Sequence, residues 1–247
     1  MCPGLWCQLL HAWYVLSQSH RQRRYFYYLT GCELPDSSLV YDIKTSKSTL
    51  FIPPIDPDSV IWSGLPVSTQ EALQTYDVDE VLTTNDLSSF LSAHKSIHAI
   101  KEQISEGAIS SSSTTNTDSL KTAIEDCRAT KDEYEIALTR KANAISTIGH
   151  MAVMKAVKKA RNERELYALW MQQGISNGAP ENAYHSIFAS GTAAATLHYV
   201  RNDQPLEGKL NLLVDAGVEV DCYASDIVST RCWTLNLSIS SNFPNKI

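Results

Sequence analysis

Apolar and polar positions alternate in short runs across residues 20–105, and these runs predict strands mixed with short helices. Residues 25–31 form an aromatic run that ends in a glycine, which predicts a buried strand. Residues 38–43 and 48–52 flank a polar segment and predict a hairpin. A further strand is expected over residues 78–82, and short helices are expected over residues 71–76 and 84–93. This mixture of elements predicts an α/β domain.

Two helices give the clearest local signals in the second half of the chain. Thr130 and Glu133 have the spacing of a capping box, and apolar residues recur behind them at helical spacing to about residue 160. A second box at residues 162–165 opens the next helix, which Gly178 stops. The apolar stripes predict that both helices pack against a core.

Strands are expected after the helices, at residues 186–190, 210–214 and 218–227. We predict that the two helices cover the sheet face that carries Leu212 and Val214. Between the last two strands lies an Asp-Ala-Gly segment, in which Gly217 allows an unusual backbone angle.

A polar segment rich in serine and threonine, residues 105–118, divides the chain. Such a composition cannot bury a core, so the segment is either a linker between domains or an inserted surface loop. We therefore expect one domain over residues 1–118, with this loop at its end, and a second domain over residues 119–247.

Composition and charge narrow the class of protein. The chain has 247 residues, of which 43% are hydrophobic and 19% charged, which is typical of a globular protein. Its net charge of -6 argues against nucleic acid as a partner. Six scattered cysteines without a CxxC pair suggest free thiols in a reducing compartment. The longest apolar stretch, residues 5–16, is too short to span a bilayer, and the basic cluster at residues 21–24 follows it rather than preceding it as in a secretory signal. We expect a cytoplasmic protein without a membrane partner.

Asp215 and Asp226 are the candidate metal ligands, because each follows or lies within an apolar run predicted to be a strand. A carboxylate at the end of a buried strand is costly unless it is paired or binds a metal. If the two strands are antiparallel, the carboxylates converge on one face and suit a hard or borderline divalent cation. The alternative is that each aspartate caps a turn through its own backbone.

His198 is the candidate catalytic residue. A histidine near a bound metal can move a proton or stabilise a developing tetrahedral intermediate. The alternative is a structural residue that is held by hydrogen bonds. His185 is a weaker candidate for the same role.

Four segments, in order and spacing, resemble the first half of the catalytic domain of the Xaa-Pro aminopeptidase/prolidase family, which has the pita-bread fold. These segments are residues 184–191, 195–199, 211–217 and 223–227. Residues 21–31 and 51–54 resemble the N-terminal domain of fungal-type aminopeptidase P. The resemblance implies a creatinase-like α/β N-terminal domain followed by the first part of a pita-bread α+β catalytic domain.

The resemblance also implies a chemistry. A member of this family is a metallopeptidase that releases the N-terminal residue from peptides with proline in second position, using two Mn²⁺ ions per subunit. Asp215 then binds one metal ion, Asp226 bridges both, and His198 lies beside the metal centre and assists the reaction. The implied partners are proline-containing peptides and further copies of the chain in a homo-oligomer.

The chain also departs from the family pattern. The family completes its metal site with one histidine and two glutamates later in the sequence, whereas residues 227–247 contain no histidine, aspartate or glutamate. Residues 228–247 therefore form an atypical tail. The alternative function is that of a truncated or non-catalytic relative without a complete two-metal site, and for this exact chain we predict little or no aminopeptidase activity.

Overall fold

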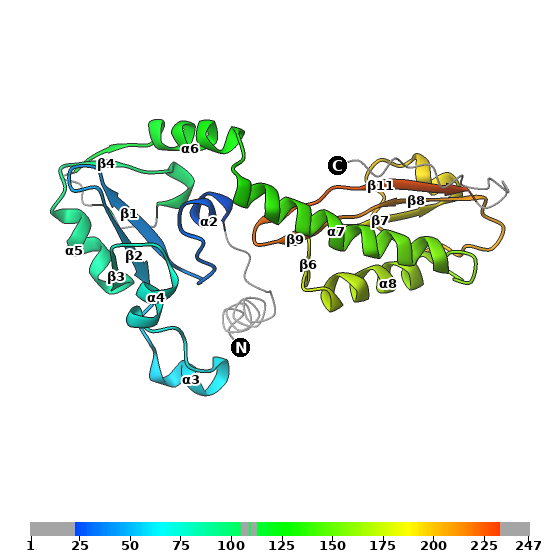
Figure 1. The fold of residues 1–247 in the computed structure, drawn as a ribbon, viewed down its shortest axis with the longest axis horizontal. Helices are drawn as coiled ribbons and strands as arrows, with labels where there is room; N and C mark the ends of the chain where they lie inside the picture. The colour runs from blue at the N-terminus through cyan, green and yellow to red at the C-terminus, as the bar shows by residue number, and fades with distance from the viewer. Residues whose placement is uncertain (1–22, 105–108, 110–112, 233–247) are drawn as a thin grey trace, which may run out of the picture. The chain divides into compact units, whose positions relative to one another are not determined.

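The computed structural model describes residues 23–104, 109 and 113–232. The chain divides into two compact units, residues 1–130 and 131–247 (Figure 1). Each unit has its own buried apolar cluster and is described separately. None of the helices in the described part of the chain is long and apolar enough to cross a membrane.

The first unit contains a three-stranded sheet in the order β1-β2-β3. β1 and β2 are antiparallel, which confirms the expected hairpin, and β3 is parallel to β2. The core contains Cys32, Leu50, Ile52, Ala72 and Val81. In chain order the helices and strands are α2 (Arg24–Thr30), β1 (Ser38–Asp42), β2 (Lys47–Ile52), α3 (Pro57–Ser63), α4 (Thr69–Thr75), β3 (Glu80–Thr83), α5 (Leu87–Ser92), β4 (Ser96–His98), β5 (Thr114–Asn116) and α6 (Ser119–Ala129).

The strand prediction over residues 25–31 is wrong, because this segment forms the helix α2. Gly31 adopts a left-handed conformation with φ of 63° and donates its backbone N–H to the carbonyl of Tyr27. That geometry is a helix C-cap, for which glycine is the preferred residue. A glycine after an apolar run is compatible with a strand end and with a helix end, and the hydrogen-bonded cap distinguishes the two.

The Ser/Thr-rich segment contributes one short strand. Its residues 114–116 form β5, which pairs in parallel with β4. Residues 105–108 and 110–112 of the same segment lie outside the described residues.

The second unit, as far as residue 232, contains two α-helices, a short 3-10 helix at Gly191–Ala195 and two small antiparallel sheets. One sheet has the strand order β11-β8-β7 and the other has the order β10-β9-β6. In chain order the elements are α7 (Glu133–Ala156), α8 (Glu163–Ser176), β6 (Glu181–Asn182), β7 (Ile187–Ser190), β8 (Asn211–Asp215), β9 (Val218–Val220), β10 (Tyr223–Ala224) and β11 (Val228–Cys232).

The two helices lie side by side and pack on the β7-β8-β11 sheet (Figure 1). Leu212 and Val214 of β8 share one cluster with Leu138 of α7 and with Leu166 and Trp170 of α8. The predicted packing face is therefore confirmed. Because side chains alternate along a strand, the residues between and after them, including Asp215, belong to the opposite face of β8.

The single strand expected over residues 218–227 is wrong, because it is a two-stranded hairpin. Asp221 and Cys222 have φ of 48° and 64°, and they connect β9 to β10. Positive φ at both central residues is the conformation that a two-residue hairpin loop requires. Neither residue is a glycine, so the turn has no strong sequence signal. Asp226 consequently lies between β10 and β11 rather than within a strand.

Residues 228–232, the beginning of the expected atypical tail, form β11. This strand pairs antiparallel with β8, and Val228 is opposite Asp215. The rest of the tail lies outside the described residues.

Candidate metal site

Asp215 and Asp226 converge on one hydroxyl group. Tyr184 donates to the Oδ1 atom of Asp215 at 2.6 Å and to the Oδ1 atom of Asp226 at 2.9 Å. The two carboxylate oxygens can therefore be no farther apart than the sum of these distances. The predicted convergence is confirmed, although one of the two residues lies in a loop.

Tyr184 is the residue of this site that the pattern analysis did not single out. Burial is the main cause that raises the pKa of Tyr184 far above its usual range, and the two neighbouring carboxylates raise it further. The phenol therefore keeps its proton at neutral pH and remains a donor. The signal available in the sequence was its place at the start of the segment 184–191.

Gly217 allows the two carboxylate-bearing segments to approach. A Cβ atom at this position would lie 1.9 Å from the carbonyl oxygen of Ser225 and 3.2 Å from Cε1 of Tyr184. The backbone before Asp226 thus passes directly over the backbone after Asp215. A side chain here would separate the two aspartates, so glycine is required for close approach rather than for its φ angle.

Ser146 of α7 contacts both of the backbone segments that approach each other at Gly217. The buried hydroxyls of Ser146 and Ser225 lie 2.6 Å apart, and the backbone N–H of Val218 donates to the Ser146 hydroxyl at 3.0 Å. Ser146 and Ser225 are both fully or almost fully buried. Ser146 lies on the buried face of α7. From the sequence alone, a serine at such a position reads as a small core residue, because its hydrogen-bond partner Ser225 is distant in sequence.

His150, one turn further along α7, is also buried beneath the site. Its Nε2 atom lies 3.0 Å from the carbonyl oxygen of Ala216, and its Nδ1 atom lies 2.9 Å from the Ser229 hydroxyl. Burial lowers the pKa of His150, so the ring is neutral at pH 7. Because a carbonyl only accepts, Nε2 carries the proton and Nδ1 accepts from Ser229. The ring therefore links the end of β8 to β11.

The two aspartates line a pocket of about 380 Å³. His198, the candidate catalytic residue, lines the same pocket, so the structure brings all three candidate residues to one cavity. His185 lines it as well, and its Nε2 atom is 3.1 Å from the carbonyl oxygen of Val200. That hydrogen bond ties His185 to the segment that carries His198.

Two carboxylates that share one neutral donor fit a hard divalent cation, which prefers oxygen ligands. Among the described residues, however, no group of three or more histidine, cysteine, aspartate or glutamate side chains is arranged to hold a metal ion. At this pocket the described part of the chain thus offers two carboxylates that could hold a metal ion.

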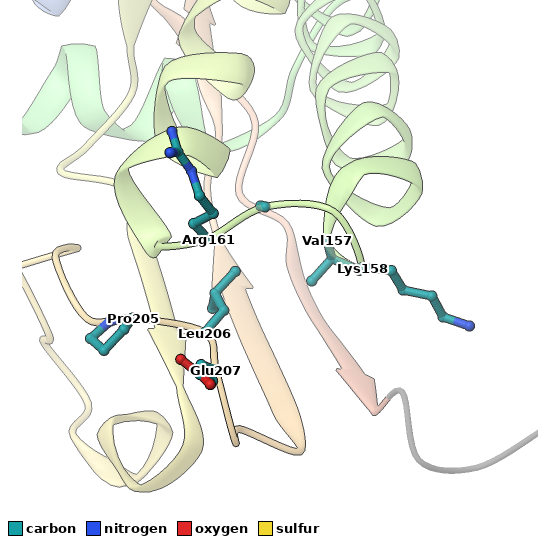
Figure 2. A pocket seen from close by; sticks show the side chains of 7 residues that line it. Val157, Lys158, Arg161, Pro205, Leu206 and Glu207 are labelled. Carbon is teal, nitrogen blue, oxygen red and sulfur yellow. The ribbon is translucent and has the colours of Figure 1, made fainter.

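A larger cavity of about 690 Å³ lies elsewhere in the second unit (Figure 2). It lies between the turn that joins α7 to α8 and the segment before β8, and it is lined by Val157, Lys158, Ala160, Arg161, Pro205, Leu206 and Glu207. Figure 2 shows the Lys158 side chain pointing away from the other lining residues. Neither Asp215 nor Asp226 lines this cavity, so it is separate from the pocket that the two aspartates share.

Comparison with known proteins shows which proteins the chain resembles. The model for the N-terminal domain of aminopeptidase P matches residues 16–101, and the model for metallopeptidase family M24 matches residues 137–238. A probable Xaa-Pro aminopeptidase of Colletotrichum graminicola is 61% identical over 216 residues, which are 85% of this chain and 47% of the relative. A second, from Sclerotinia sclerotiorum, is 61% identical over 219 residues, which are 87% of this chain and 40% of the relative.

The chain therefore resembles an aminopeptidase P N-terminal domain followed by part of an M24 metallopeptidase domain, and it is similar to fungal proteins named as probable Xaa-Pro aminopeptidases. It spans about half the length of the curated relatives that it matches. Its N-terminal aminopeptidase P domain is followed by the start of the M24 metallopeptidase domain, which confirms the expected fold. The M24 match reaches residue 238, beyond residue 228 where the atypical tail was expected to begin.

Solved structures of Xaa-Pro aminopeptidase relatives share this fold. Pseudomonas aeruginosa aminopeptidase PepP has a TM-score of 0.75 and 26% identity, over 87% of this chain and 53% of that chain. Aminopeptidase P from E. coli in its low-pH form has a TM-score of 0.78 and 23% identity, over 87% of this chain and 54% of that chain.

Proposed function

We propose that these residues form the first part of a metallopeptidase that releases the N-terminal residue from peptides with proline in second position. The observation that carries the proposal is the convergence of Asp215 and Asp226 on the Tyr184 hydroxyl, in a pocket that His198 also lines. The names of the fungal relatives, at 61% identity, support the substrate class.

Each residue has a proposed role. Asp215 and Asp226 hold divalent metal ions, for which we propose two Mn²⁺ per subunit. When bound, such ions lower the pKa of a water nucleophile and polarise the scissile carbonyl. Tyr184 stays protonated and orients the two carboxylates. His198 moves a proton or stabilises the tetrahedral intermediate from the rim of the pocket.

The proposal extends to the surroundings of the protein. Its substrates are proline-containing peptides, it acts as a homo-oligomer, and neither nucleic acid nor membrane is a partner. We place it in the cytoplasm, because the four described cysteines, Cys32, Cys127, Cys222 and Cys232, are free thiols, which a reducing compartment preserves. The net charge of -6 is unsuited to a phosphate backbone.

A non-catalytic relative is the second candidate function. One observation favours it: the described residues provide two metal-binding carboxylates and no group of three or more such ligands. Two carboxylates compete poorly with water for a hard cation. On this hypothesis the chain binds Mn²⁺ weakly and has little or no turnover.

Mn²⁺ binding by the purified chain tests the site. We expect Asp215→Asn and Asp226→Asn each to weaken binding by roughly tenfold or more, because loss of even an outer-shell partner has that effect. Asp221→Asn is the matched control, since Asp221 lies in the nearby β9–β10 turn and asparagine tolerates its positive φ of 48°. The measurement is the decrease of the free Mn²⁺ signal in electron paramagnetic resonance.

Turnover then separates the two candidate functions. The assay uses the purified chain with excess Mn²⁺ and an Xaa-Pro dipeptide or tripeptide. Turnover that Asp226→Asn abolishes supports the peptidase, whereas binding without turnover supports the non-catalytic relative. Mn²⁺ binding that Asp221→Asn weakens as much as Asp226→Asn does would refute the proposed site and, with it, the peptidase that depends on that site.

A further inference from the structure

Glu163 is a fully buried carboxylate that the proposed reaction does not use. It is the first residue of α8 and is 0 % exposed. Its Oε1 atom accepts hydrogen bonds from the backbone N–H and the hydroxyl of Ser190, both at 2.8 Å. Its Oε2 atom accepts from the Tyr199 hydroxyl at 2.7 Å and from the Gln204 backbone N–H at 3.0 Å.

These hydrogen bonds fasten both ends of one loop. Ser190 is the last residue of β7, and Gln204 lies farther along the connection between β7 and β8, which continues to residue 210. The Glu163 backbone N–H also donates to the Gln204 carbonyl at 3.0 Å. One carboxylate therefore joins the start of α8 to the beginning and the end of segment 190–204, which contains His198.

Within the segment, the anchor is adjacent to the candidate catalytic residue. Tyr199 is buried, with 8 % exposure, whereas His198 before it and Val200 after it are exposed. Burial first, and the hydrogen bond to Glu163 second, raise the pKa of Tyr199 to about 12. Because Tyr199 is held inside, His198 is presented on the outer side of the segment, where it lines the pocket with Asp215 and Asp226.

Helix capping does not account for Glu163. The N-cap of α8 is Asn162, whose side chain accepts from the Glu165 backbone N–H at 3.1 Å. A buried carboxylate is costly unless hydrogen bonds satisfy it, and an apolar side chain would fill the same space without that cost. All four groups that donate hydrogen bonds to the carboxylate belong to segment 190–204, so we infer that the carboxylate fixes the conformation of this segment.

We propose that Glu163 is a positioning residue for His198: through Ser190, Tyr199 and Gln204 it holds the loop so that the His198 ring faces the Asp215–Asp226 pair. The inference rests on the proposed function, because it takes these two aspartates as the metal ligands. The inference adds to the site a residue of α8, whereas Ser146 and His150 belong to α7. Glu163 acts on the site only through segment 190–204.

Nuclear magnetic resonance of the histidine rings in the full chain, titrated with Mn²⁺ alone, tests the proposal. A paramagnetic ion at Asp215 and Asp226 broadens ring signals according to their distance from it. His150 is the internal reference, since its ring bonds the Ala216 carbonyl next to Asp215 and belongs to α7 rather than to the loop.

Glu163→Gln should reduce the broadening of His198 severalfold relative to His150, because an amide places a donor against donors and releases the loop. Glu135→Gln is the matched control. Glu135 is also buried, also lies in the first turn of a helix and also accepts from a tyrosine, Tyr223 at 2.7 Å, but it holds the β9–β10 hairpin instead. We expect it to leave the ratio unchanged.

Tyr199→Phe keeps the test decisive if Glu163→Gln does not fold. It removes one donor, leaves the carboxylate with three, and should lower the same ratio to a smaller extent. A ratio that neither variant changes, while His150 is broadened as in the wild type, overturns the positioning role and leaves the metal site intact. If Mn²⁺ does not broaden His150 in the wild type, the proposed metal site fails and this inference fails with it.

Discussion

At the scale of single residues, close approach of two backbones determines whether the carboxylates meet. Ten residues separate Asp215 from Asp226 in the sequence, yet the hydroxyl of Tyr184 forms hydrogen bonds with both carboxylates. The contact depends on Gly217, which has no side chain to keep the Ser225 carbonyl away. Aspartates in apolar surroundings are visible in a sequence. The tyrosine that joins them is not, because its partners lie 31 and 42 residues away.

Gly217→Ala should destabilise the second unit by about 1–3 kcal/mol or more, because its Cβ would overlap backbone atoms that cannot move independently. Mn²⁺ binding should decrease in parallel. Gly208→Ala is the control, since Gly208 has φ of 72° with open space around it, so that its cost is backbone strain of about 1 kcal/mol. Urea denaturation of both variants measures the difference. Equal midpoints for the two would show that the close approach at Gly217 is not constraining.

At the scale of elements, the residue at which α7 begins depends on tertiary contacts, because the sequence alone offers more than one capping box. The sequence offers two pairs with capping-box spacing, Thr130 with Glu133 and Asp132 with Glu135. The structure uses the second pair, so the sequence-based choice is wrong by two residues. Glu135 is buried and also accepts from Tyr223, a contact that a residue at position 133 does not make.

Asp132→Ala should cost about 1 kcal/mol in the free energy of unfolding, the typical effect of losing an N-cap. Thr130→Ala should change it by less than about 0.5 kcal/mol, as at an ordinary surface position. Thermal and urea unfolding of the two variants provide the measurement. A larger effect at Thr130 would mean that the helix begins where the sequence pattern placed it.

In α8, too, local spacing identifies the start of the helix but not the contacts of each residue in its first turn. Asn162 caps α8 as expected, but Glu165 does not complete the box, because its carboxylate binds the backbone N–H and the side chain of Arg161. Glu163 in the same segment has the larger structural role, and its partners come from segment 190–204. Local spacing predicts that a helix begins here, but it does not predict which of two glutamates is buried.

At the scale of the whole molecule, β11 is an edge strand of the β11-β8-β7 sheet among the described residues. Its Val228 is 60 % exposed. An unpaired strand edge with apolar side chains is a template for association with another chain. In the described part of the second unit, β11 therefore offers an edge at which another chain could associate.

Purified chain should self-associate with increasing concentration, and Val228→Lys and Thr230→Lys should both reduce this association by placing a charge on the edge. Static light scattering over a concentration series measures it. Trp62→Lys removes a side chain that is 89 % exposed on α3 in the first unit, and we expect no comparable reduction. If Trp62→Lys is the more effective variant, association occurs through the first unit instead.

The sequence by itself determined most of the secondary structure of this protein and two members of its site. Helical and alternating spacings are local properties, so α7, α8, β7, β8 and the β1–β2 hairpin follow from them. Asp215 and Asp226 were recognisable because carboxylates are rarely placed in apolar strands without a partner. The ordered motifs also indicated the family resemblance that the comparisons support.

Only the tertiary structure decided how these parts act together. The shared Tyr184 proton, the crossing at Gly217, the buried ring of His150 and the four donors of Glu163 all join residues that are distant in sequence. A pattern of spacing records which face a residue occupies, whereas a hydrogen bond across 27 or 66 residues depends on how the elements pack. For that reason the two candidate ligands could be singled out from the sequence, whereas the residues that hold them in place could not.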